Sequence, residues 1–128
     1  MLRMCLIVDD EPPIRAYIRA VLERDSFQIL EAETATHALR VLKSIGTRVD
    51  VVVTDINMPG EMSGIDLAYS LQNSFPHIRT ILISGYADPE SVKRAAANFD
   101  FIQKPFVPAA ILKAVNRATE PARQALAS

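Results

Sequence analysis

Two apolar runs of this 128-residue chain end in acidic residues that could do chemistry. Val51-Val52-Val53-Thr54 leads to Asp55, and Met4-Cys5-Leu6-Ile7-Val8 leads to Asp9-Asp10-Glu11. Short apolar runs bounded by turn residues are typical of strands buried on both faces. Ligands of α/β proteins bind at the carboxyl ends of such strands. Asp9, Asp10 and Asp55 are therefore candidate functional residues, although a single aspartate after a strand is often only a turn residue.

Two more polar groups follow predicted strands, namely Ser84 and Lys104. With a strand order of 2-1-3-4-5, the ends of the first, third, fourth and fifth strands are neighbours, so these groups converge on the three aspartates. Carboxylates at about 4 Å repel by roughly 4 kcal/mol per pair at an effective dielectric of about 20, so the cluster needs a cation or protons. Oxygen ligands without His or Cys favour Mg²⁺ or Mn²⁺. The set suits phosphoryl transfer, with Asp55 as nucleophile and acyl-phosphate carrier.

The elements that must position these groups follow from the hydrophobic pattern. Strands are predicted at Met4–Val8, Phe27–Ala32, Val49–Thr54, Thr80–Ser84 and Asp100–Gln103. Helices are predicted from Pro12 to Arg24, after the N-caps Thr34, Ser63 and Asp88, and from Pro108 onward. Gly46 is expected to stop the second helix in a left-handed conformation. This alternation predicts an α/β fold: a doubly wound, flavodoxin-like, five-stranded parallel sheet in the order 2-1-3-4-5 with five helices.

Composition narrows the functional classes. Fourteen basic residues nearly balance 15 acidic ones, and no basic cluster indicates nucleic-acid binding. No apolar run reaches the roughly 20 residues of a membrane span, and the start does not resemble a signal peptide, so we expect a cytoplasmic protein without membrane contact. The single cysteine, Cys5, is expected in the core. We expect one domain over residues 1–120, followed by a frayed tail at 121–128.

Taken together, these motifs resemble the receiver domain of two-component response regulators. The matching residues are Asp9-Asp10, Asp55, Met58-Pro59, Ser84-Gly85 and Lys104-Pro105-Phe106. The resemblance covers about residues 3 to 118, and the chemotaxis response regulator is a small member of this class. It implies a signalling phosphoacceptor that catalyses its own phosphotransfer and dephosphorylation. The phosphoryl donor would be a sensor histidine kinase or a histidine phosphotransfer protein.

The resemblance also implies a role for each residue of the site. Asp55 would accept the phosphoryl group, while Asp10, Asp55 and the carbonyl of Asn57 would hold Mg²⁺, with Asp9 acting through water. Lys104 would contact the phosphoryl oxygens, and Ser84 would turn its hydroxyl toward them. Phe101 stands at the place of the aromatic switch residue, where a tyrosine is common. Lys104-Pro105 is similar to the cis peptide bond of the family. The output partner and the oligomeric state stay open, including a phosphorylation-dependent dimer.

The loop after Asp55 departs from the commonest family pattern. Gly60-Glu61 stands where one residue is usual, so Asp55 to Gly64 is one residue longer and the loop near the site is expected to differ in shape. This spacing, together with Ser84-Gly85-Tyr86-Ala87 and Lys104-Pro105-Phe106, looks more like that of receivers attached to hybrid sensor kinases than that of many DNA-binding regulators.

Three other functions can be weighed against the phosphoacceptor. An FMN carrier of the same fold would need a donor-rich phosphate loop, which Asp9-Asp10-Glu11-Pro12 is not. A haloacid-dehalogenase-like phosphatase would need an acid at position 57, where the chain has Asn57. A phosphorylation-independent interaction module would not need Asp9, Asp10, Asp55, Ser84 and Lys104 together.

Overall fold

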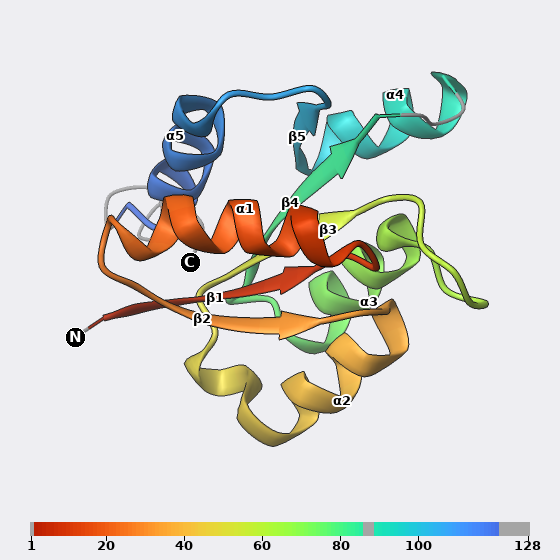
Figure 1. The fold of residues 1–128 in the computed structure, drawn as a ribbon. Helices are drawn as coiled ribbons and strands as arrows, with labels where there is room; N and C mark the ends of the chain where they lie inside the picture. The colour runs from red at the N-terminus through yellow and green to blue at the C-terminus, as the bar shows by residue number, and fades with distance from the viewer. Residues whose placement is uncertain (1, 86–88, 121–128) are drawn as a thin grey trace.

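The computed structural model describes residues 2–85 and 89–120. Its strands form one parallel sheet in the order β2-β1-β3-β4-β5, as the sequence predicts (Figure 1). The strands are β1 (Arg3–Val8), β2 (Phe27–Ala32), β3 (Val51–Asp55), β4 (Arg79–Ser84) and β5 (Asp100–Gln103). The α-helices are α1 (Pro12–Glu23), α2 (Ala35–Ile45), α3 (Gly64–Ser74), α4 (Pro89–Asn98) and α5 (Pro108–Ala118).

Helices cover both faces of the sheet. In Figure 1, α1 and α5 lie on one face, and α2 and α3 lie on the other. Side chains along β1 alternate between the two faces of the sheet. Cys5 and Ile7 pack with α1 and α5, whereas Leu6 and Val8 pack with α2 and α3. Cys5 is fully buried, as expected, and burial raises the pKa of its thiol, so it stays protonated. None of the described helices is long and apolar enough to cross a bilayer.

Local side-chain bonds fix the starts of two helices. The Thr34 hydroxyl accepts a bond from the His37 N–H at the start of α2, and Ser63 forms a capping box with Asp66 at the start of α3. These caps satisfy backbone N–H groups that have no partner within the helix. The other predicted cap, Asp88, and the tail at 121–128 lie outside the described residues.

The prediction for Gly46 is wrong. Gly46 has φ −55° and ψ −30°, which are right-handed helical values, and the chain continues into a 3₁₀ turn at Gly46–Arg48. The glycine is required for space instead. A Cβ on Gly46 would lie 2.4 Å from Cε1 of the Phe75 ring, which packs against this turn from the end of α3. A contact between distant segments, not backbone conformation, explains this glycine.

A second close approach brings α3 against the end of β3. The Gly64 N–H donates to the Ile56 carbonyl at 2.9 Å, and a Cβ on Gly64 would lie 1.9 Å from the Asp55 carbonyl oxygen. Only glycine permits this approach without moving the backbone next to Asp55. In the intervening loop, Gly60 has φ +108°, a conformation that residues with a Cβ rarely adopt. The longer loop therefore has a glycine at the position where a residue with a Cβ would be strained.

Candidate functional site

Asp55 is the last residue of β3 and is 6% exposed. Its Oδ1 accepts a bond from the Asn57 N–H at 3.2 Å, and its Oδ2 lies 3.3 Å from the Lys104 Nζ. The Asp55 carbonyl accepts a bond from the Thr54 hydroxyl at 3.0 Å. The carboxylate is therefore held in one orientation at the carboxyl edge of the sheet, with an ammonium group on one oxygen.

Two more carboxylates lie beside it, from the turn between β1 and α1. One oxygen from each of Asp9, Glu11 and Asp55 lies within 4.8 Å of the others. Asp9 is buried, and its Oδ1 accepts a bond from the Glu11 N–H at 2.8 Å. Arg15 of α1 donates to the Asp9 carbonyl at 2.7 Å, which fixes the turn from the other side. Sequence reasoning named Asp9 and Asp55 but missed Glu11, whose signal was its place as the third acid of the same run.

Lys104 is the cation of this acidic group. It follows β5 directly, its N–H donates to the Ser84 carbonyl at 2.9 Å, and the Lys104–Pro105 bond is cis. The Nζ lies 3.3 Å from Asp55 and 3.8 Å from both Asp9 and Glu11. One ammonium thus faces three carboxylates, which leaves the group with excess negative charge.

Burial, and to a lesser extent the neighbouring negative charge, makes ionisation of Asp9 unfavourable. Its pKa is raised from 3.8 to about 6, first by burial and then by the neighbouring charge of Asp55, against the opposing bond from the Glu11 N–H. Burial and like charge both favour the protonated form of a carboxyl group. A bound cation would reverse this penalty, because it would stabilise the charged forms of all three acids.

The remaining predicted ligands lie around the same cavity. A hollow of about 280 Å³ is lined by Asp10, Glu11, Asp55, Asn57, Gly85 and Lys104. Asp10 and Asn57 are exposed at its mouth, whereas Asp55 lies buried within it. A set of carboxylate and carbonyl oxygens with an excess of negative charge fits a hard divalent cation such as Mg²⁺. The residues present therefore can hold the metal that the sequence predicts.

Ser84 ends β4 next to this cavity and is 3% exposed. Its hydroxyl oxygen is the only fully buried side-chain N or O atom in the described residues that has no hydrogen-bond partner. Buried hydroxyls normally have a partner, so an unpaired one marks a place where a further group can bind. Ser84 lies between Asp55 and Lys104 along the sheet edge, because β4 pairs with both β3 and β5.

Phe101 lies farther from the acids, in the middle of β5. It is half-buried, stands opposite Leu82 of β4 and packs against a cluster that includes Ala68 of α3 and Ala95 of α4. Its strand continues directly to Lys104. The structure therefore places the predicted switch residue three positions before Lys104 on the same backbone segment.

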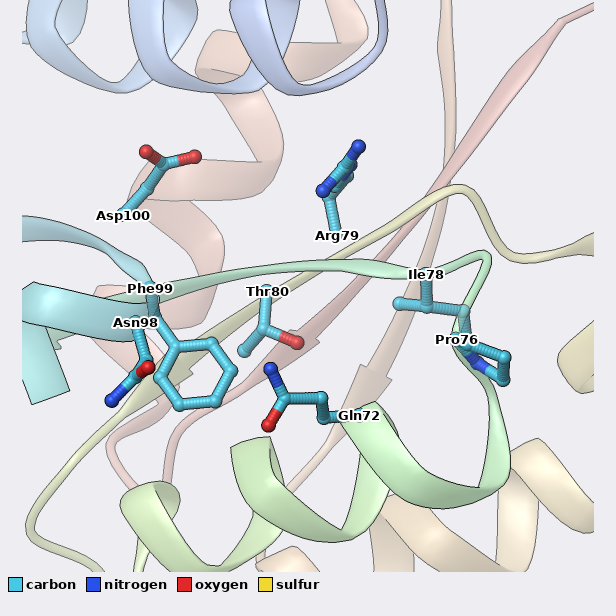
Figure 2. Close-up of a pocket in the computed structure, with 8 residues that line it drawn as sticks. All are labelled: Gln72, Pro76, Ile78, Arg79, Thr80, Asn98, Phe99 and Asp100. Atoms are coloured by element: carbon cyan, nitrogen blue, oxygen red, sulfur yellow. The ribbon is translucent and has the colours of Figure 1, made fainter. Parts of the chain in front are cut away.

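Another hollow, of about 130 Å³, lies at the opposite, amino-terminal end of β4 and β5 (Figure 2). Figure 2 shows Thr80 and Phe99 directed toward Gln72 of α3, while Arg79 and Asp100 are directed to the other side of the sheet. Both charged side chains that border this hollow are directed away from it, so it is a poor candidate for phosphoryl chemistry.

Comparisons with known proteins agree with this geometry. The model of the response regulator receiver domain family matches residues 5–116. The transcriptional regulatory protein FixJ of Rhizobium meliloti is 36% identical over 116 residues, which are 89% of this chain and 55% of FixJ. The sensor kinase CckA of Brucella abortus is 36% identical over 103 residues, which are 79% of this chain and 11% of CckA. The chain thus spans only part of these relatives.

A solved structure gives the same result. A response regulator receiver domain protein from Clostridium thermocellum superposes with a TM-score of 0.89 at 30% identity, covering 99% of this chain and 100% of that one. The match over residues 5–116 includes every residue of the acidic edge, from Asp9 to Lys104. This chain belongs to the response regulator receiver domain family of two-component signalling.

Proposed function

We propose that this chain is a phosphoacceptor that takes a phosphoryl group on Asp55 from a phosphohistidine of a sensor kinase or phosphotransfer protein. The observation that carries the proposal is the buried Asp55 carboxylate, 3.3 Å from Lys104 within an acidic group. The reaction would take place in the cytoplasm, as is typical of response regulators. The chain would signal through its phosphorylated state and would act catalytically only on itself.

The transfer step is balanced as follows. A carboxylate oxygen of Asp55 forms a bond to phosphorus, the phosphorus–nitrogen bond of the donor breaks, and the imidazole leaves with the bonding electron pair. Hydrolysis by water later returns the carboxylate and inorganic phosphate. Lys104 would offset charge on the phosphoryl oxygens, and the Ser84 hydroxyl would supply the hydrogen bond for which it has no partner among the described residues.

A divalent cation would supply the remaining positive charge. Asp10, Asp55 and the carbonyl of Asn57 would hold Mg²⁺ or Mn²⁺, with Asp9 acting through water, and the cation would lower the repulsion between the acids and the incoming phosphoryl group. The charge excess around Lys104 supports this assignment, since one ammonium does not neutralise three carboxylates.

The signal would leave the site through Ser84, Lys104 and Phe101. A phosphoryl group adds about −1.5 to −2 charge and strong acceptor oxygens, which would draw the Ser84 hydroxyl and the Lys104 ammonium toward Asp55. The half-buried ring of Phe101 would then change its packing, and a partner would bind the altered face beside β5. Phosphorylation shifts this equilibrium only as far as it favours one of the two states.

An apolar groove next to the site supports a protein as the phosphoryl donor. Its volume is about 530 Å³, and it is lined by Ile14, Tyr17, Gly85, Lys104, Pro105 and Phe106. Gly85 and Lys104 line both this groove and the acidic cavity. Tyr17 is 39% exposed, and the centroid of its ring lies 5.7 Å from that of Phe106. A helix that carries the phosphohistidine could pack its apolar face here while the imidazole reaches Asp55.

The test of the function is labelling with acetyl phosphate, followed by intact mass. We expect one acid-labile phosphoryl group, only with Mg²⁺ or Mn²⁺, and none in Asp55→Asn. An unlabelled wild-type protein would favour the phosphorylation-independent module. The donor groove is tested separately with Tyr17→Ala, which should slow transfer from a phosphohistidine protein while leaving labelling by acetyl phosphate intact. Equal slowing of both reactions would argue against the groove as a docking surface.

A further inference from the structure

We propose that Glu11 determines how tightly this chain holds its divalent cation, although the family motif assigns no metal role to this residue. The inference rests on the proposed function, because it concerns the same cation site. Asp10 and Glu11 are both exposed, but it is Glu11 that forms the group of converging carboxylates with Asp9 and Asp55. Its Oε2 also lies 3.8 Å from the Lys104 Nζ.

The backbone around Glu11 directs its side chain to the cavity. The Glu11 N–H donates to Asp9 Oδ1 at 2.8 Å, and its carbonyl accepts the first bonds of α1, from Ile14 and Arg15. Pro12 keeps Glu11 extended, at φ −97° and ψ 109°. The backbone is thus fixed on both sides, while the side chain forms no cap bond to α1. Replacing the carboxylate therefore removes no helix-capping interaction.

Charge explains what the carboxylate does there. Asp9, Glu11 and Asp55 carry three negative charges against the one positive charge of Lys104. Asp10 lines the same cavity and adds to this excess, which a divalent cation would offset. Without Glu11, the excess is smaller by one negative charge and the attraction for the cation falls. The Glu11 side chain is 59% exposed, so salt and water weaken its contribution, and its effect should shrink as ionic strength rises.

Glu11 also affects Lys104 before the cation arrives. Lys104 is shared by three carboxylates, two of them at 3.8 Å. A cation held by Asp10, Asp55 and Asn57 would offset the charge of Asp9 and Glu11, and the contact with Asp55 at 3.3 Å is already the shortest of the three that the ammonium makes. Cation binding would thereby prepare Lys104 for the phosphoryl group. Glu11 is a positioning residue in this step, because it acts on the cation and on Lys104, not on the reacting phosphorus.

The experiment compares Glu11→Gln with Glu120→Gln in the full chain. Both substitutions remove one exposed negative charge, but Glu120 follows α5, beyond the amino-terminal edge of the sheet. We expect Mg²⁺ affinity, measured by calorimetric titration at low salt, to fall about 3- to 10-fold in Glu11→Gln, and this loss to shrink with added salt. Glu120→Gln should bind like the wild type. The thermal unfolding of each variant checks that it is folded.

A second measurement follows the side-chain NMR signal of Lys104 without metal. We expect Glu11→Gln to shift this signal and Glu120→Gln to leave it in place. A loss of Mg²⁺ affinity in Glu11→Gln no larger than in Glu120→Gln would overturn the inference, even if the wild type is labelled on Asp55. A clear loss of affinity in a protein that acetyl phosphate never labels would instead uphold the inference and refute the proposed function.

Discussion

The two ends of the sheet handle charge in opposite ways. At the amino-terminal edge, Arg3 donates to Asn116 Oδ1 at 2.6 Å, to the Thr119 hydroxyl at 3.1 Å and to the Asp25 carbonyl at 3.1 Å. It also lies 3.5 Å from the Asp25 carboxylate and over the Phe27 ring. At the carboxyl edge, by contrast, the single ammonium group of Lys104 lies near three carboxylates.

The difference separates a structural network from a binding site. Asn116 completes the amino-terminal network by donating to Asp25 Oδ2 at 2.9 Å, so one cation, one anion and their polar neighbours satisfy one another. Such a network needs no ligand. The carboxyl edge keeps an excess of carboxylates and the unpaired Ser84 hydroxyl, and both are costs that a cation and a phosphoryl group would remove. The fold tolerates this imbalance where the chemistry is proposed.

The largest expected effect on stability is at the amino-terminal edge, here called the balanced edge because Arg3 and Asp25 neutralise each other. Arg3→Ala should lower the free energy of unfolding by about 2 kcal/mol, because it removes several hydrogen bonds and the contact with Phe27 and leaves Asp25 without its cation. Urea denaturation measures the loss. Arg48→Ala, at an exposed arginine, is the matched control and should change stability by less than about 0.5 kcal/mol. Equal effects of the two variants would contradict a structural role for the network.

At the carboxyl edge, where the acids outnumber Lys104, neutralising an acid should raise the free energy of unfolding instead of lowering it. Without metal at pH 8, Asp9→Asn should raise the free energy of unfolding by about 1–2 kcal/mol, since it removes a buried charge near Asp55. The folded-state pKa of Asp9 is about 6, above the ordinary 3.8, so the folded state binds the proton more tightly. Wild-type stability should therefore fall as the pH rises from about 4 to about 6, and Asp9→Asn should lack this contribution.

Denaturation across this pH range checks the sign. The control is Asp25→Asn, which alters the balanced edge and should lose stability at pH 8. If Asp9→Asn is less stable than the wild type at pH 8 and equally so at pH 4, burial of Asp9 carries no electrostatic cost.

The stabilisation by bound Mg²⁺ should be a smaller effect, and it should depend on the acids of the carboxyl edge but not on Arg3. At about five times its dissociation constant, Mg²⁺ should stabilise the wild type by about 1 kcal/mol, because it binds only the folded site. Asp10→Ala should lose most of this gain, since a hard cation depends on few carboxylates here. Arg3→Ala should keep all of it despite its lower stability. Thermal unfolding with and without Mg²⁺ measures both. A gain that survives in Asp10→Ala would remove Asp10 from the cation site.

The smallest effect is conformational. Phosphorylation should shift the amide NMR signals of Ser84, Phe101 and Lys104 and leave those of Arg3 and Asn116 almost unchanged, because the balanced network has no unsatisfied group to respond. Phe101→Ala should accept the phosphoryl group but show a weaker response beyond Lys104. Shifts confined to the loop after Asp55 would contradict the proposed switch.

Sequence alone determined the fold and the placement of most polar groups at the carboxyl edge. Strand and helix periods, caps and proline positions are local signals, so they fix where each strand ends, and parallel strands bring those ends together. Asp9, Asp55, Ser84 and Lys104 follow from this rule. Glu11 does not, because whether a side chain at a helix start turns to solvent or into a cavity depends on the packing around it.

Contacts between distant segments were decided only by the tertiary structure. Gly46 is needed because the Phe75 ring leaves no room for a Cβ, not because the backbone is left-handed. No local sequence pattern predicts such a contact. Arg3 and Asn116 are 113 positions apart and meet only because α5 packs along the sheet with its end beside the start of β1. The net charge at each edge depends on groups from distant parts of the chain, which only folding brings together. For that reason, the sequence predicted an excess of acids at the carboxyl edge, but only the structure showed that Glu11 belongs to it and that Arg3 and Asp25 balance each other at the other edge.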